Sequence, residues 1–194
     1  MEVMSKLIIC AGRGRSGSTL QYNIIRFTYY YFFGSENVYA TAHVRDYNRN
    51  NKSKYHIIKS HEPHDFLFKH CDEVYSSIRD PEDQKRSRKN HAKKEKNQDL
   101  TETQLSEWLD YDEKRWIKWK SNKNFKHTFY FEDIINKNKV IEFICDSLNK
   151  KYSQEIYNFV SQELNKLKLP QKGYDKLSGL TSQHITSNKY KNNE

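Results

Sequence analysis

Four short runs of mostly apolar residues recur along the chain and predict buried β-strands. These runs are Lys6–Ala11, Tyr55–Lys59, Glu73–Ile78 and His127–Phe131. Short apolar runs are typical of strands in parallel sheets, whose faces are both covered. Because helical patterns lie between or after these runs, the sequence favours an α/β fold, with a parallel β-sheet flanked by helices on both faces.

Apolar residues at helical spacing predict the helices. One helix spans Leu20 to Phe33, and two later ones span Ile134–Leu148 and Ser153–Leu167, with Ser153 as the N-cap. A fourth begins after Thr101 and Gln104, which resemble a capping box. Its apolar face consists of Leu105, Trp108, Leu109, Trp116 and Trp119, and Asp112 interrupts it. The tryptophans on this face are expected to serve the core rather than a ligand.

Three polar stretches lack this periodicity and are expected to be loop-like. Asp46–Lys54 is polar and basic, and Lys172–Glu194 is expected to be flexible or ordered only by a ligand. The stretch Lys85–Lys96 holds seven cationic residues and one acidic residue, Glu95. It is either a solvated helix face or a docking surface for a polyanion.

Length, charge and cysteine usage restrict the class of protein. A chain of 194 residues is expected to form one domain, 1–194, and its net charge is +9. Cys10, Cys71 and Cys145 are far apart, without metal-ligand spacing, and predict reduced, buried thiols in a cytoplasmic protein. No apolar run reaches membrane-spanning length, and the first strand begins close to Met1. We therefore expect a soluble protein without a membrane anchor or a secretory signal.

The segment between the first strand and the first helix has the spacing of a phosphate-binding loop. It runs Gly12-Arg13-Gly14-Arg15-Ser16-Gly17-Ser18-Thr19, which fits the pattern G-x-x-x-x-G-x-[ST]. Glycines allow a tight turn that presents backbone N–H groups, and the helix start adds free amides and a partial positive charge. Ser18 stands where nucleotide kinases keep a lysine. The loop is therefore expected to hold a phosphate, without implying the β- and γ-phosphates of ATP.

Chemically active residues also follow the second and third predicted strands. Ligands of such sheets bind beyond the carboxyl ends of the strands. Lys59-Ser60-His61-Glu62 ends one strand and Arg79-Asp80-Pro81 ends the next. A triphosphate hydrolase would be expected to carry an acidic Mg²⁺ ligand after an apolar strand. Asp80 keeps that alternative open, although Asp-Pro commonly caps a following helix.

Four segments, in order, resemble the sulfotransferases that use 3′-phosphoadenosine 5′-phosphosulfate (PAPS). Arg15-Ser16-Gly17-Ser18-Thr19-Leu20 is similar to the 5′-phosphosulfate loop, in the R-S-G-S-T form of bacterial and carbohydrate-type members, and Lys59-Ser60-His61 is similar to the K-T-H segment. Arg79 with Ser87 eight residues later resembles the 3′-phosphate site. Tyr130-Phe131-Glu132-Asp133-Ile134 resembles the Y-E-D-L segment with one residue inserted. The resemblance covers about residues 6–150 and implies the P-loop-containing nucleoside triphosphate hydrolase-like fold of sulfotransferases.

The resemblance also implies roles for individual residues. His61 would be the catalytic base, Lys59 and Arg15 would stabilise charge, and Glu62 is the rival base. Cofactor binding would fall to Arg13, Gly14, Arg15, Ser16, Gly17, Ser18, Thr19, Arg79 and Ser87. PAPS would be the cofactor, 3′-phosphoadenosine 5′-phosphate (PAP) its product, and no metal is expected.

The chain departs from the family at its C-terminal end, and other functions stay open. The glycine-rich loop that covers the cofactor in many members is not evident, and Leu180–Ser187 could replace it. The acceptor is expected to be a hydroxyl of a carbohydrate or small molecule. The alternatives are a P-loop kinase or phosphotransferase and, with less support, a basic nucleic-acid-binding protein, since no recognition motif accompanies the charge. The sequence does not indicate an oligomeric state.

Overall fold

The computed structural model describes residues 5–171 and 173–181. The strands are β1 (Lys6–Cys10), β2 (Val38–Thr41), β3 (Tyr55–Lys59), β4 (Glu73–Ile78) and β5 (Phe125–Tyr130). The α-helices are α1 (Ser18–Phe33), α2 (Asp65–His70), α3 (Pro81–Lys96), α4 (Glu102–Lys120), α5 (Phe131–Ile135), α6 (Lys137–Ser147) and α7 (Gln154–Lys166). Two 3-10 turns, η1 (Ser35–Asn37) and η2 (Val44–Asp46), flank β2.

The five strands form a single parallel sheet in the order β2-β3-β1-β4-β5, which confirms the predicted α/β fold. Cys10, the last residue of β1, pairs with Lys59 on one side and with Tyr75 on the other. The strand order reverses beside β1, so the segments that leave β1, β3 and β4 emerge next to one another. Such a switch point is where α/β sheets bind their ligands.

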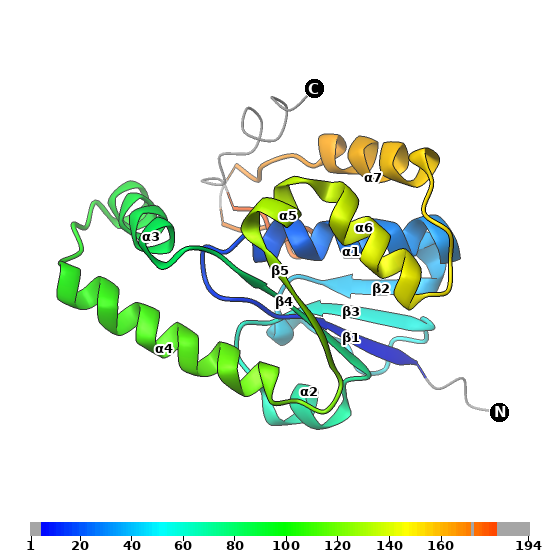
Figure 1. Cartoon of the computed structure of the whole chain (residues 1–194), viewed down its shortest axis with the longest axis horizontal. Coiled ribbons are helices and arrows are strands. Elements are labelled where there is room, and N and C mark those ends of the chain that lie inside the picture. Colours follow the sequence, from blue (N-terminus) through cyan, green and yellow to red (C-terminus); the bar gives the residue numbers. More distant parts are fainter. Residues whose placement is uncertain (1–4, 172, 182–194) are drawn as a thin grey trace.

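Helices cover both faces of the sheet (Figure 1). On one face α1 is packed against α6 and α7, and the larger apolar core lies there, with Ile24, Ile57 and Ile144 fully buried. On the other face, Leu67 of α2 and Trp119 of α4 belong to a smaller apolar cluster with residues of β1, β3 and β4. Among the described residues, no helix is long and apolar enough to cross a membrane.

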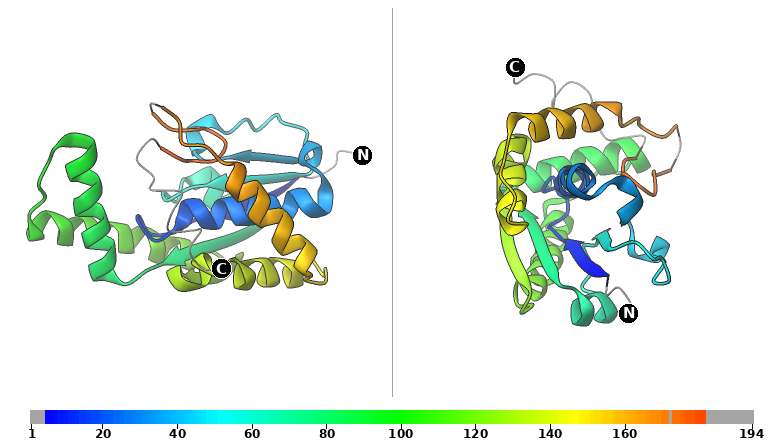
Figure 2. Two further views of the ribbon diagram at one scale, coloured as in Figure 1. Left: turned by 90° about the horizontal axis from the view of Figure 1, so that it is seen from above. Right: turned by 90° about the vertical axis from the view of Figure 1, so that its right-hand side faces the viewer.

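Helices α3 and α4 form a hairpin that projects beyond the carboxyl edge of the sheet (Figure 2). Asp80 is the N-cap of α3 and accepts a hydrogen bond from Asp83 N at 3.0 Å, with Pro81 in the first turn. The predicted capping box of Thr101 and Gln104 opens α4 and is confirmed. Both helices of the hairpin therefore begin at a capped residue. The hairpin faces the segments that leave β1 and β3.

The structure corrects three sequence-based predictions. Lys85–Lys96 is not loop-like, because it lies in α3, where frequent cationic residues leave no continuous apolar stripe in the sequence. The edge strand β2 was missed because four residues are too few for an alternating pattern to stand out. The helix expected over Ile134–Leu148 is two helices, since Asn136 adopts a non-helical backbone conformation between α5 and α6.

Other predictions are confirmed. Ser153 is the N-cap of α7 and accepts a hydrogen bond from Ile156 N. Cys10, Cys71 and Cys145 are free, buried thiols. Of the C-terminal stretch, residues 173–181 are described, whereas position 172 and positions 182–194 lie outside the described residues. Most of the segment Leu180–Ser187 therefore cannot be compared with the prediction.

Candidate functional site

The loop Gly12–Thr19 connects β1 to α1 and depends on glycine at two positions. Gly12 has φ 149°, and a Cβ there would lie 2.1 Å from Ser77 Oγ. Gly17 is the N-cap of α1 in the left-handed conformation, φ 84°, and its Cβ would lie 2.9 Å from Phe131 Cδ2. Both positions exclude a side chain by strain and by contact. Ser18 and Thr19 then open α1, so the free amides of its first turn line the loop.

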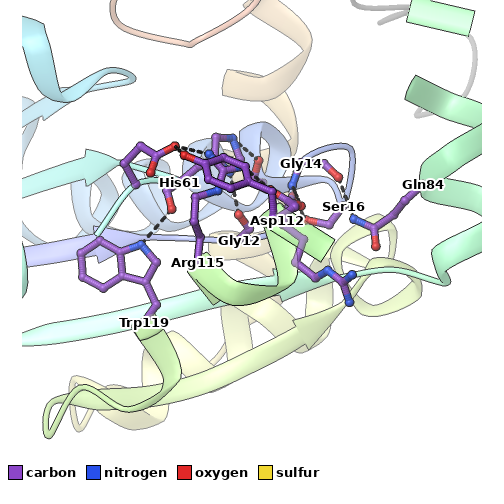
Figure 3. Close-up of polar contacts among 12 residues, drawn as sticks. Gly12, Gly14, Ser16, His61, Gln84, Asp112, Arg115 and Trp119 are labelled. Carbon is purple, nitrogen blue, oxygen red and sulfur yellow. Dashed lines mark hydrogen bonds and ion pairs between the residues drawn. The ribbon is translucent and has the colours of Figure 1, made fainter. Parts of the chain in front are cut away.

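The interior of the loop is held from two sides. Ser16 is fully buried, and its Oγ bonds to Arg13 O at 2.5 Å and to Ser77 Oγ at 2.6 Å. Gly14 N donates to Asp112 Oδ2 at 2.5 Å, and Gly14 O accepts from Gln84 Nε2 at 2.7 Å (Figure 3). Helices α3 and α4 therefore hold the peptide units on either side of the Gly14 Cα, which fixes the shape of the loop before any ligand binds.

His61 lies against this loop with a defined tautomer. Its Nδ1 is 2.6 Å from Gly12 O, and because a carbonyl oxygen can only accept, Nδ1 carries the hydrogen. The lone pair is then on Nε2, which lies 3.5 Å from Ser18 Oγ. Burial, followed by the nearby Lys59 ammonium, lowers the pKa of His61 to about 3. The imidazole is therefore neutral at pH 7, with the lone pair on Nε2.

Lys59 ends β3 beside the loop. Burial, followed by repulsion from Arg15, lowers the pKa of Lys59 to about 8. A Cβ added at Gly179, in the C-terminal segment, would lie 3.8 Å from Lys59 Cδ and 3.7 Å from Thr19 Cγ2. Two cationic side chains at one edge of the sheet favour an anionic ligand there, because its charge would relieve their repulsion.

Arg15, assigned from the sequence to the 5′-phosphosulfate, contacts Ser87, which was assigned with Arg79 to the 3′-phosphate. Arg15 Nε donates to Ser87 Oγ at 3.1 Å, joining the loop to α3. Arg15 also has a positive φ of 62°, which is unusual for a residue with a side chain. Strained backbone of this kind is frequent at ligand-binding sites.

Arg79 lies at the end of β4, near the loop but facing a different set of partners. Its NH2 is 3.3 Å from Asp83 Oδ2, and its guanidinium lies 4.0 Å from the centre of the Phe131 ring. Phe131 in turn packs on Gly17. The structure therefore connects Arg79 to the loop through Phe131, and the described contacts do not join Arg79 to Ser87 directly.

Glu62 is already engaged by other side chains. Arg115 NH1 forms an ion pair with Glu62 Oε1, and Tyr111 OH lies 3.4 Å from the same oxygen. Of the two candidate bases, His61 contacts the glycine-rich loop through both ring nitrogens, whereas the described side-chain contacts of Glu62 are to α4.

Several buried polar groups around the loop have no hydrogen-bond partner within the described residues. They are Nε and NH2 of Arg13, Nε of Arg79 and Oε1 of Gln84. Arg13 is nearly fully buried, and its closest acidic oxygen is Glu113 Oε2 at 3.9 Å. Unpaired donors beside a glycine-rich loop are suited to a ligand with several anionic groups. The arrangement can therefore bind a phosphorylated molecule and can remove a proton from a second one.

Sequence reasoning missed three residues of this site: Gln84, Asp112 and Arg115. Asp112 left a signal, because a carboxylate in the apolar stripe of an amphipathic helix needs a buried partner. Arg115, one turn later, is that partner. Gln84 left none, since it lies in a helix where polar residues are the rule.

Comparisons with known proteins identify the fold. No known family model matches the sequence, and no curated protein does. Among solved structures, a mouse sulfotransferase, SULT7A1, complexed with PAP superimposes with a TM-score of 0.57 at 15% identity, covering 82% of this chain and 63% of that one. Retinol dehydratase in complex with androsterone and the inactive cofactor PAP gives 0.56 at 14% identity, covering 80% and 63%. The chain thus has the sulfotransferase fold, and it spans about 63% of the length of these two proteins.

Proposed function

We propose that this protein is a PAPS-dependent sulfotransferase that transfers the sulfuryl group to a hydroxyl of a carbohydrate or small molecule. One observation carries the proposal: the neutral imidazole of His61 is anchored to Gly12 O and turns its unprotonated Nε2 toward Ser18 of the phosphate loop. A proton acceptor is thereby held next to an anion site, as sulfuryl transfer to a hydroxyl requires. The solved structures of the same fold hold PAP.

The residues around the loop fit PAPS. The amides of Gly17, Ser18 and Thr19, with the side chains of Arg15 and Lys59, would hold the 5′-phosphosulfate. Arg79 and Ser87 would hold the 3′-phosphate, which distinguishes this cofactor from ATP. The donor groups of Arg13 and Arg79 that have no partner are consistent with a ligand carrying two separated anionic groups. When bound, PAPS supplies the activated sulfuryl group.

The other steps belong to the side chains of this chain. His61 would accept the proton of the acceptor hydroxyl at Nε2, and the bond from Nδ1 to Gly12 O would hold the ring in place. A positioned base contributes ~10²–10⁴-fold to a rate. Lys59 and Arg15 would stabilise the negative charge that develops as the donor bond breaks. Asp80, the candidate Mg²⁺ ligand of the kinase alternative, is the N-cap of α3, the role that Asp-Pro commonly has.

Calorimetry with two nucleotides tests the proposal. We expect PAP to bind the protein without Mg²⁺ and to bind more tightly than ATP·Mg²⁺. The reason is that the loop lacks the lysine of nucleotide kinases, whereas Arg79 and Ser87 suit a 3′-phosphate. Equal or tighter binding of ATP·Mg²⁺ would contradict the proposal and favour a P-loop phosphotransferase.

A further inference from the structure

One face of α4 contacts both halves of the candidate site. Trp108, Asp112, Arg115 and Trp119 are spaced by four, three and four residues, so they form one stripe along the helix. Trp108 and Asp112 lie next to Gly14 of the phosphate loop. Arg115 bonds to Glu62 and Trp119 bonds to His61, in the segment that follows β3. Figure 3 shows Asp112, Arg115 and Trp119 on α4 beside the loop and His61. The stripe therefore spans the distance between the anion site and the base.

At the loop end, the contacts converge on Gly14. A Cβ at this position would lie 2.8 Å from Trp108 Cζ2 and 3.6 Å from Asp112 Oδ1. The carboxylate of Asp112 is 1% exposed and accepts the hydrogen bond from Gly14 N. A charged acceptor makes this bond stronger than one between neutral groups. Asp112 thus fixes the middle of the loop.

At the other end, the contacts converge on His61 and Glu62. Trp119 Nε1 donates to His61 O at 3.1 Å, and Arg115 NH1 bonds to Glu62 Oε1. Trp119 is fully buried and cannot shift without disturbing the core. The backbone that carries the base is therefore held from α4, as the phosphate loop is.

Arg115 joins the two ends. Its NH2 bonds to Asp112 Oδ1 and its NH1 bonds to Glu62 Oε1, so one planar guanidinium bridges the carboxylate at the loop and the carboxylate beside the base. Burial raises the pKa of Asp112, and the charge of Arg115 opposes this shift. A lysine could not make both bonds with the same geometry, because its single ammonium lacks the fork.

We propose that Asp112 and Arg115 are positioning residues that couple the phosphate loop to His61. Each acts through another group: Asp112 through the peptide of Gly14, and Arg115 through Glu62, which neighbours the base. The loop and the base are thereby kept in one arrangement, so a change at either end alters the other. This inference builds on the proposed function, and its first test is independent of any ligand.

The first test is hydrogen exchange of the ligand-free protein. Asp112→Asn removes the charge while keeping the shape, and Arg115→Lys keeps the charge while removing the bridge. We expect Asp112→Asn to speed exchange in residues 12–20 about tenfold, the size of losing one charge-assisted bond. Arg115→Lys should speed exchange in both residues 12–20 and residues 60–62. The controls are Asp110→Asn and Arg86→Lys, at exposed positions of the same hairpin.

Two outcomes of this test would overturn the coupling. One is unchanged exchange in both segments. The other is faster exchange throughout the protein with a lowered melting temperature, which would mean that the two residues serve stability alone. If Asp112→Asn does not fold, Arg115→Lys still tests the coupling, because it retains a positive charge beside Asp112.

The second test is a double-mutant cycle on the dissociation constant of PAP. We expect Asp112→Asn to raise it about tenfold and Glu62→Gln to raise it several-fold, although no described bond joins Glu62 to the loop. The double variant should raise the dissociation constant by less than the product of the two single-variant factors, because both substitutions act through Arg115. A full product, or no effect of Glu62→Gln, would refute the coupling. Failure of the unaltered protein to bind PAP would instead refute the proposed function, and hydrogen exchange would still decide the coupling.

Discussion

His61 and Glu62 are neighbours at the end of β3, but their surroundings suit them to different tasks. His61 has an unprotonated Nε2 that faces Ser18, whereas the carboxylate of Glu62 is held by Arg115. We therefore predict that His61→Gln lowers the rate of PAP release from PAPS by ~10²–10⁴-fold, the contribution of a positioned base. Glu62→Gln should lower this rate less than about tenfold, since it removes only an indirect contact.

The affinity for PAP separates a chemical role of His61 from a structural one. His61 donates to the loop through Nδ1, and the amide of glutamine can take over that bond. PAP should therefore bind His61→Gln within a few-fold of its affinity for the unaltered protein. A larger loss of rate for Glu62→Gln than for His61→Gln would make Glu62 the base.

Lys59 gives the candidate site a pH dependence above neutrality. Its pKa is about 8 because the ammonium is buried and lies near Arg15. We predict that the affinity for PAP falls as pH rises through 8, since the free protein then loses a charge that the anionic ligand needs. Calorimetry between pH 6.5 and 9.5 measures this change, and Lys59→Arg should remove the inflection because arginine stays charged.

The lowered pKa of Lys59 also makes the free energy of unfolding depend on pH. The unfolded lysine keeps its ordinary pKa of 10.5, so between pH 8 and 10.5 the unfolded state binds more protons than the folded state. The contribution of Lys59 to the free energy of unfolding therefore rises with pH in this window. If the contribution of Lys59 to the free energy of unfolding decreased between pH 8 and 10.5, it would contradict the burial of Lys59.

Arg79 is the residue whose proposed role is most specific to the cofactor. We predict that Arg79→Ala weakens binding of PAP much more than binding of adenosine 5′-phosphosulfate, which has no 3′-phosphate. Arg86→Ala is the matched control, because Arg86 also forms an ion pair with Asp83 but is exposed. Equal losses for the two nucleotides would remove the 3′-phosphate role from Arg79, as calorimetry can establish.

At the scale of the element, the junction of loop and helix at Gly17 combines strain with close packing. A side chain there would need φ 84° and would meet Phe131. We predict that Gly17→Ala costs about 1–3 kcal/mol of unfolding free energy and weakens PAP binding more than tenfold. Gly173→Ala is the control, since Gly173 has a similar φ of 72° but no atom within 4 Å of its Cβ. Equal losses in chemical denaturation for both variants would show that contact with Phe131 adds nothing.

The elements that the sequence predicted well are those with strong local signals. Tyr55–Lys59 and Glu73–Ile78 are strands with the predicted bounds, because both are short runs with aromatic and β-branched residues that are buried on two faces. The position of the glycine-rich loop between β1 and α1 was predictable, because its glycines and its place after a strand are local features. Confirmed caps, such as Thr101 and Ser153, depend on the spacing of three or four residues.

Contacts between distant segments could not be predicted in the same way. The bond from Gln84 to Gly14 and the bridge from Asp112 through Arg115 to Glu62 join residues that are far apart in sequence. Their partners are known only once α3 and α4 have folded back along the sheet. The sequence indicated an irregularity at Asp112, but only the fold supplies its explanation.

At the scale of the whole molecule, residues 173–181 return to α1 beside the phosphate loop. Leu177 O accepts hydrogen bonds from Tyr22 OH at 2.7 Å and from Arg26 NH1 at 2.9 Å, and Ser178 O accepts one from Asn23 Nδ2 at 2.8 Å. Gly179 then lies against Lys59. The far end of the chain therefore contributes to the burial that lowers the pKa of Lys59.

This connection predicts an effect of α1 on the pH dependence of the site. Arg26 is buried, and Arg26→Met keeps an apolar side chain there while removing a charge-assisted bond worth about 1.5–3 kcal/mol. We expect faster hydrogen exchange in residues 173–181 and better hydration of Lys59, which moves its pKa up toward 10.5. The inflection in PAP affinity should therefore move above pH 8. Arg49→Met, which removes a guanidinium packed on Phe66, should leave it in place. If hydrogen exchange in residues 173–181 became faster but the inflection in PAP affinity stayed at pH 8, the C-terminal segment would not contribute to the burial of Lys59.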